Sequence, residues 1–214
     1  MQADVVGPAG RLEALLEDAP DAAFAAVVCH PHPRFGGTMN THAVHRLAKA
    51  VRARGGASLR FNFRGVGRSA GSYAAGDGEA EDARAALDWL AAAKPGLELL
   101  ACGFSFGAWM AVLAGGGDGR VAGLLLAGLA LRAPDLQRFR ESSLVRDVAK
   151  PVAIVQAEAD EFASPDEVRA AIEGSRGPRR LATVKGAKHL FTEDLPALQR
   201  EAEAALDWLR GGAP

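Results

Sequence analysis

The chain of 214 residues has two cysteines, one tyrosine, a net charge of −1 and no long apolar run. Cys29 and Cys102 each end an apolar stretch, which is typical of buried reduced thiols and not of a disulfide framework. The near-zero charge gives no electrostatic reason to expect nucleic acid or an anionic membrane as a partner. No run approaches the roughly 20 apolar residues that span a bilayer, and MQADVVGPAG at the N-terminus lacks signal-peptide features. We therefore predict a cytoplasmic protein, and its oligomeric state stays open.

The sequence does contain a regular alternation of short apolar runs with longer helical patterns. The predicted strands are residues 24–29, 58–63, 97–102, 121–127, 152–156 and 180–184. The predicted helices are residues 41–54, 79–93, 166–173 and 195–210. Residues 4–6 and 11–17 predict an antiparallel hairpin at one edge of the sheet.

Strands that are apolar throughout are buried on both faces, and their alternation with helices indicates a mostly parallel sheet covered by helices on both sides. Composition is ordinary for a globular protein, and neither a linker nor a repeat interrupts it, so residues 1–214 are predicted to form one α/β domain. Residues 131–150 are the least patterned segment. They form either a short flap over a site or a long connection, and they are too few for a large cap domain.

The stretch ACGFSFGAWM, residues 101–110, places Ser105 between Gly103 and Gly107 and then enters an apolar helix. A strand, a tight turn and a helix are the context of the G-x-S-x-G nucleophile elbow. Side chains two positions on either side of such a serine would collide with the neighbouring strand and helix, which explains the glycines. The alternative is an ordinary strand–helix turn.

A serine hydroxyl needs a base within hydrogen-bond distance, and the base needs an orienting acid. His189 is the only histidine that follows Ser105, and it lies between the last predicted strand and the last helix. Three carboxylates follow the strand before it, namely Glu158, Asp160 and Glu161. Asp160 is favoured because it lies one short loop beyond the strand, and Glu158 is the next choice.

These motifs resemble the α/β-hydrolase superfamily, in particular its small, lidless bacterial members related to dienelactone hydrolase, which carry HPHPxxGG after an early strand. This chain has CHPHPRFGGTMN at residues 29–40, then FNFRGVGRSAGS, GFSFG, the acid loop and GAKHLF in the same order. The resemblance implies serine-dependent hydrolysis with Ser105 as nucleophile, Asp160 as acid and His189 as base. Ala157 stands where such proteins usually have a glycine, which leaves the choice between Asp160 and Glu158 open.

The oxyanion formed in acyl transfer needs two backbone N–H donors. One is expected from Phe106, the residue after the nucleophile. The other should come from the HPHPRFGG loop, in which Pro31 and Pro33 have no N–H. His32, Arg34 and Phe35 are the candidate donors of this stretch. His32 is the choice because the resemblance would place the donor there.

Several large apolar side chains near these motifs are candidates for the core, and three of them are also candidates for lining a substrate pocket. These three are Phe35, Phe104 and Phe162. Phe104 flanks the nucleophile directly, so it is expected to serve both roles.

Two other motifs invite different interpretations. HPHP together with His42 and His45 suggests a metal site, but the latter two share a polar helix face with Lys49 and Arg52, and no cysteine or carboxylate completes a ligand set. GVGRSAG, residues 65–71, lacks the spacing and the following helix of a dinucleotide fingerprint, so it is predicted to be a tight loop in which Arg64 binds local carbonyls. No metal and no cofactor are expected.

The sequence thus predicts a cofactor-independent serine hydrolase that cleaves small acyl esters through an acyl-enzyme intermediate. Thioesters, lactones, amides and peptides are alternative substrates for the same three groups. A non-catalytic binding protein with the same fold is the remaining alternative, because a fold alone does not imply activity.

Overall fold

The computed structural model describes residues 1–19, 21–133, 136, 139 and 143–211. These residues form a mostly parallel sheet of eight strands in the order β1-β2-β4-β3-β5-β6-β7-β8, in which β1 and β2 are antiparallel to their neighbours. The strands are β1 (Gln2–Gly7), β2 (Gly10–Glu17), β3 (Phe24–Cys29), β4 (Gly56–Phe61), β5 (Glu98–Phe104), β6 (Val121–Ala127), β7 (Val152–Ala157) and β8 (Arg179–Val184). The predicted α/β class and the hairpin at one edge are confirmed.

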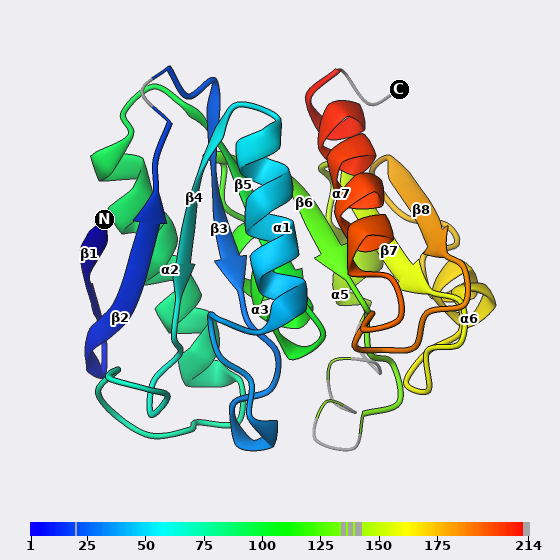
Figure 1. Cartoon of the computed structure of the whole chain (residues 1–214), viewed down its shortest axis with the longest axis horizontal. Coiled ribbons are helices and arrows are strands. Elements are labelled where there is room, and N and C mark those ends of the chain that lie inside the picture. Colours follow the sequence, from blue (N-terminus) through cyan, green and yellow to red (C-terminus); the bar gives the residue numbers. More distant parts are fainter. Residues whose placement is uncertain (20, 134–135, 137–138, 140–142, 212–214) are drawn as a thin grey trace.

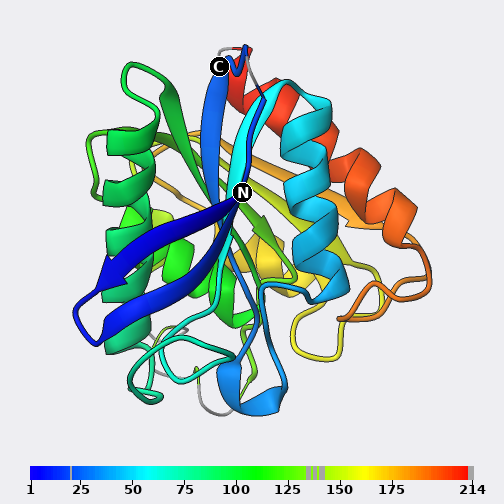
Figure 2. The same ribbon diagram turned by 60° about the vertical axis from the view of Figure 1, so that its left-hand side comes forward.

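Helices cover both faces of the sheet (Figures 1 and 2). The helices are α1 (His42–Ala53), α2 (Asp77–Ala93), α3 (Phe106–Gly115), α5 (Leu144–Asp147), α6 (Pro165–Ala171) and α7 (Leu195–Arg210), with a 3-10 turn η1 (Pro33–Phe35). In Figure 1, α1 and α7 lie in front of the sheet and α2 lies behind it. None of the described helices is long and apolar enough to cross a membrane.

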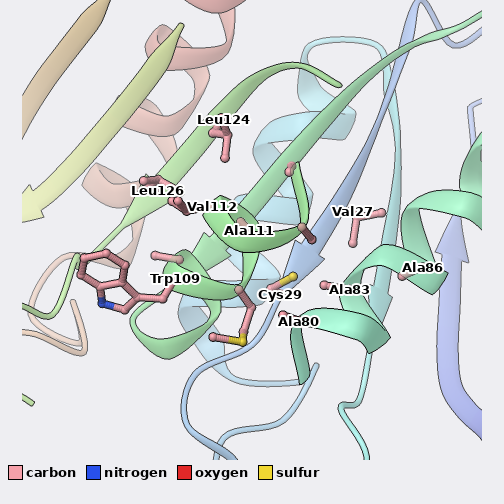
Figure 3. Close-up of a cluster of buried hydrophobic side chains, with 14 of the residues drawn as sticks. Val27, Cys29, Ala80, Ala83, Ala86, Trp109, Ala111, Val112, Leu124 and Leu126 are labelled. Carbon is pink, nitrogen blue, oxygen red and sulfur yellow. The ribbon is translucent and has the colours of Figure 1, made fainter. Parts of the chain in front are cut away.

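Two apolar layers, one on each face of the sheet, hold the helices in place. Figure 3 shows part of the layer beneath α2 and α3, where Ala80, Ala83 and Ala86 bring α2 close to the sheet. Trp109 is the largest side chain of this layer, and its indole N–H donates to the Ala130 carbonyl at 3.0 Å. The neighbouring strands β3 and β4 are buried along their whole length, as the apolar runs predicted.

Strand β4 differs from its predicted range of residues 58–63, because it begins at Gly56 and ends at Phe61. Beyond the strand, the Phe63 N–H donates to the His30 Nε2 atom at 3.0 Å. The side chain of His30, in the loop that follows the neighbouring strand β3, therefore accepts from a backbone N–H that would otherwise pair with a strand. Cys29 and Cys102 are free, buried thiols, as predicted.

The parallel strands end at one edge of the sheet, which is the lower edge in Figure 1, and the turn η1 lies there. In the segment 131–150, residues 134–135, 137–138 and 140–142 lie outside the described residues. The prediction that this segment forms a flap therefore falls partly on residues that the structure does not describe.

Candidate active site

Ser105 occupies a strained turn between β5 and α3. Its φ is 57° and its ψ is −119°, a combination of backbone angles that residues other than glycine rarely adopt. A Cβ atom built on Gly103 would lie 2.0 Å from the Gly107 carbonyl oxygen, and one built on Gly107 would lie 2.3 Å from the Cys29 carbonyl oxygen. Both positions therefore exclude any side chain, which is the steric reason for the glycines.

Ser105, His189 and Asp160 form a continuous hydrogen-bonded chain. The Ser105 Oγ atom lies 2.8 Å from His189 Nε2, and His189 Nδ1 lies 2.8 Å from Asp160 Oδ2. Because a carboxylate accepts only, the Nδ1–H donates to Asp160, and Nε2 is left to accept the serine proton. All three side chains are buried below one-tenth exposure. The structure thus brings together the three residues that the sequence singled out.

The carboxylate next to the imidazole is that of Asp160, in the loop after β7. Its Oδ1 atom accepts the Phe162 N–H at 2.9 Å. The alternative, Glu158, instead accepts the Gly186 N–H at 2.8 Å. Glu161 accepts the backbone N–H of His189 at 3.3 Å, so its carboxylate contacts the main chain of the histidine and not its ring.

The HPHPRFGG loop passes directly over the first turn of α3. A Cβ atom on Gly107 would lie 2.5 Å from the His30 carbonyl oxygen, and the rings of His32 and Phe106 lie 4.9 Å apart. The two candidate oxyanion donors therefore belong to adjacent segments. The N–H of Phe106 is in the first turn of α3, where a helix supplies no internal acceptor.

His30 holds the peptide that carries the His32 N–H. Its Nε2 atom accepts the Phe63 N–H, so the proton is on Nδ1, which donates to the Pro31 carbonyl at 2.6 Å. A trans peptide is planar, with its C=O and N–H pointing in opposite directions. The hydrogen bond to Pro31 therefore fixes the direction of the His32 N–H as well.

Burial lowers the pKa of His30 from 6.5 to about 4. Between these two values the unfolded chain binds a proton that the folded chain does not, so the free energy of unfolding falls as the pH is lowered. From pH 6.5 to pH 4 the loss is expected to be roughly 3 kcal/mol. Urea unfolding at several pH values should show this dependence, and it should be much weaker in His30→Gln. His42→Gln, at an exposed position of α1, is the matched control and should retain it; an unchanged dependence in His30→Gln would contradict the assignment.

A pocket of about 520 Å³ opens beside Ser105 and His189. Its lining includes the three predicted phenylalanines, Phe35, Phe104 and Phe162. Phe104 and Phe162 both contact the His189 ring, with centroid distances of 5.2 Å and 4.7 Å. Phe35 is 77% exposed and lies with Leu190 at the rim, so its interpretation as a core residue is wrong.

The remaining motifs have structural partners. The Arg64 guanidinium makes two hydrogen bonds to the Asp82 carboxylate on α2, at 3.0 Å and 2.8 Å, so the prediction that it binds local carbonyls is wrong. His42 and His45 are exposed on α1. Among the described residues, no group of three or more His, Cys, Asp and Glu side chains is arranged to hold a metal ion.

Two side chains next to the site were not among the predicted site residues. Gln156 in β7 is fully buried and donates to Asp160 Oδ2 at 2.9 Å. The Tyr73 hydroxyl lies 3.0 Å from His32 Nε2. An amide inside the otherwise apolar run VAIVQA is a signal that could have identified Gln156, because a buried amide requires partners. The loop that carries Tyr73 has no comparable signal.

Residues 26–206 match the family model described as an alpha/beta hydrolase domain. The structure is similar to that of an alpha-beta serine hydrolase homologue from Coxiella burnetii, with a TM-score of 0.86, 33% identity, and 96% of this chain and 97% of the other covered. A serine hydrolase without a lid from Xanthomonas campestris gives a TM-score of 0.85 and 30% identity over 100% of this chain and 96% of the other. An uncharacterized protein of Rickettsia prowazekii is 35% identical over 178 residues, which are 76% of this chain and 68% of that protein.

Proposed function

Since the chain belongs to the alpha/beta hydrolase family and is therefore a hydrolase, we propose that it is a serine hydrolase that cleaves small acyl esters. The observation that carries this proposal is the hydrogen-bonded chain from Asp160 through His189 to Ser105, in which His189 and Ser105 line the pocket. It supports a catalytic protein over a binding protein that merely retains the fold, because a binding role requires no such chain.

In the proposed reaction, Ser105 Oγ attacks the ester carbonyl carbon while its proton passes to His189 Nε2. The N–H groups of Phe106 and His32 stabilise the oxyanion, and the positive end of the α3 dipole supports the same charge. The tetrahedral intermediate collapses as the imidazolium protonates the leaving alcohol, which leaves an acyl-enzyme. His189 then accepts a proton from water, the hydroxide attacks the acyl carbon, and the acid is released with Ser105 protonated again.

The pocket favours uncharged acyl groups. Phe104, Phe162 and Leu190 give it apolar walls, and Glu161 is the only Asp, Glu, Lys or Arg among the described residues that line it. Arg132 donates to the backbone carbonyl of Glu161 but pairs with the carboxylate of Glu167, and no cation of the described residues forms an ion pair with the Glu161 carboxylate. An anionic acyl group placed here would meet a like charge in a partly desolvated site.

Reaction with a fluorophosphonate probe and turnover of p-nitrophenyl esters test the proposal. We expect the probe to label Ser105, as located by peptide mass spectrometry, and p-nitrophenyl butyrate to be hydrolysed faster than mono-p-nitrophenyl succinate. Glu161→Gln should reduce the difference in hydrolysis rate between these two esters of similar length, and it should still hydrolyse the neutral ester. Matched thioester, lactone and amide substrates separate ester cleavage from its alternatives. A wild-type protein that is inert toward both the probe and the whole panel would contradict the proposal.

A further inference from the structure

Gln156 is a polar side chain in the middle of the apolar core. It lies in β7, is fully buried, and follows four buried apolar residues of the strand. Burying an amide without hydrogen bonds is costly, so its contacts show what the side chain does. Its Oε1 atom accepts the Leu129 N–H at 2.9 Å, and its Nε2 atom donates to Asp160 Oδ2 and to the Ala163 carbonyl, both at 2.9 Å.

These three partners determine the orientation of the amide. The Leu129 N–H is a donor and must face the oxygen, so the NH₂ group must face the two acceptors. A flipped amide would oppose its oxygen to the Asp160 carboxylate and to the Ala163 carbonyl. Gln156 therefore presents a fixed donor to the same carboxylate oxygen that accepts the His189 Nδ1–H.

We propose that Gln156 is a positioning residue for the hydrolytic reaction, which fixes Asp160 Oδ2 against the His189 imidazole and supplies the carboxylate with a neutral donor. This inference rests on the proposed function. Asp160 is 4% exposed, and among the described residues its carboxylate accepts from His189 Nδ1, Gln156 Nε2 and the Phe162 N–H. Without Gln156, the carboxylate would be stabilised mainly by the imidazole. The Asp160 carboxylate would then stabilise the protonated form of His189 more strongly, and a protonated imidazole cannot accept the serine proton.

The charged groups around this pair differ from the neutral Gln156 in where they bind. Glu161 contacts the backbone of His189, Glu158 accepts from Gly186, and Arg132 donates to the Glu161 carbonyl. Gln156 alone among these four donates directly to the Asp160 carboxylate. Its removal should therefore move the pH dependence of the reaction, beyond any loss of stability.

Gln156→Met tests the inference, because methionine has a similar length and volume but no amide. Ile154→Ala is the matched control, since Ile154 lies on the same strand two positions earlier, is equally buried, and belongs to the apolar core. Each full-length variant is assayed with p-nitrophenyl butyrate and by the rate of inactivation with paraoxon from pH 5 to pH 9. Thermal unfolding is measured alongside.

For Gln156→Met we expect about a tenfold lower kcat/KM at pH 7. The acid limb of its profile of kcat/KM against pH should be shifted to higher pH by about 0.5 to 1 unit. Paraoxon inactivation should show the same shift. Ile154→Ala should lower the Tm and leave the acid limb unchanged. A folded Gln156→Met protein with the wild-type acid limb would overturn the inference and leave Gln156 a structural residue.

Should Gln156→Met fail to fold, Gln156→Asn supplies the second measurement. Asparagine keeps an amide in the core but is one methylene shorter, so its NH₂ group falls short of hydrogen-bond distance to Asp160 Oδ2, and the acid limb should shift in the same direction as in Gln156→Met. An unshifted limb in this variant also overturns the inference. If wild type reacts with paraoxon and the shift is absent, only the role of Gln156 fails; if wild type itself is unreactive, the proposed function fails and the inference fails with it.

Discussion

Ser105→Ala is expected to lower kcat for p-nitrophenyl butyrate by about 10⁴-fold or more and to abolish labelling by a fluorophosphonate. The substitution removes one oxygen atom, and with it both the nucleophile and the hydrogen bond to His189 Nε2. The backbone contact of the residue is retained, since the Ser105 N–H donates to the Ala127 carbonyl at 2.9 Å. The loss should therefore fall almost entirely on activity, and the Tm should stay close to that of the wild type.

Steady-state kinetics, gel detection of the probe and a thermal melt measure this result together. Ser72→Ala, at an exposed serine, is the matched control and should behave as wild type in all three. A Ser105→Ala protein that retains more than about one-tenth of the wild-type rate would show that another group is the nucleophile.

Gly107→Ala is expected to have the largest effect on stability, lowering the free energy of unfolding by roughly 3 to 5 kcal/mol or preventing folding. The new methyl group would lie 2.3 Å from the Cys29 carbonyl oxygen and 2.5 Å from that of His30. Both atoms are backbone, at the end of β3 and at the start of the HPHPRFGG loop, so neither moves without displacing the strand or the loop. Activity should fall as well, because the same displacement shifts the N–H of His32.

Urea unfolding of the two proteins provides the measurement, with Gly117→Ala as the control. Gly117 is exposed, and a Cβ atom there would meet nothing within 4 Å, so this variant should be neutral or slightly more stable. Equal unfolding free energies for Gly107→Ala and wild type would show that the close approach of the loop to α3 does not exist in solution.

The elements that could be predicted were those whose signal is local. The strands β3 and β6 and the helix α7 begin and end at the predicted residues, because the apolar run or helical periodicity that predicts each of them lies within the element itself. The range predicted for β4 was wrong at both ends. Its C-terminal limit depends on His30, which is 33 residues away from Phe63 in the sequence.

The candidate site divides in the same way. Ser105 could be predicted from the flanking glycines Gly103 and Gly107, and His189 because it is the only histidine that follows Ser105. The preference for Asp160 over Glu158 was open in the sequence, because two carboxylates in one short loop differ only in the direction in which the loop turns them. Phe35 has an aromatic side chain typical of a core residue, yet the turn η1 carries it to the rim of the pocket.

The sequence by itself determined the alternation of strands and helices, the elbow around Ser105 and the order of the three reacting side-chain types, since each depends on near neighbours or on chain order. Only the tertiary structure decided which carboxylate accepts from the imidazole, how His30 orients the peptide between Pro31 and His32, and that Gln156 donates to Asp160. The physical reason is distance along the chain. Ser105 and His189 are 84 residues apart and His189 and Asp160 are 29 apart, and hydrogen bonds of 2.8 Å between such residues depend on the path of every intervening loop.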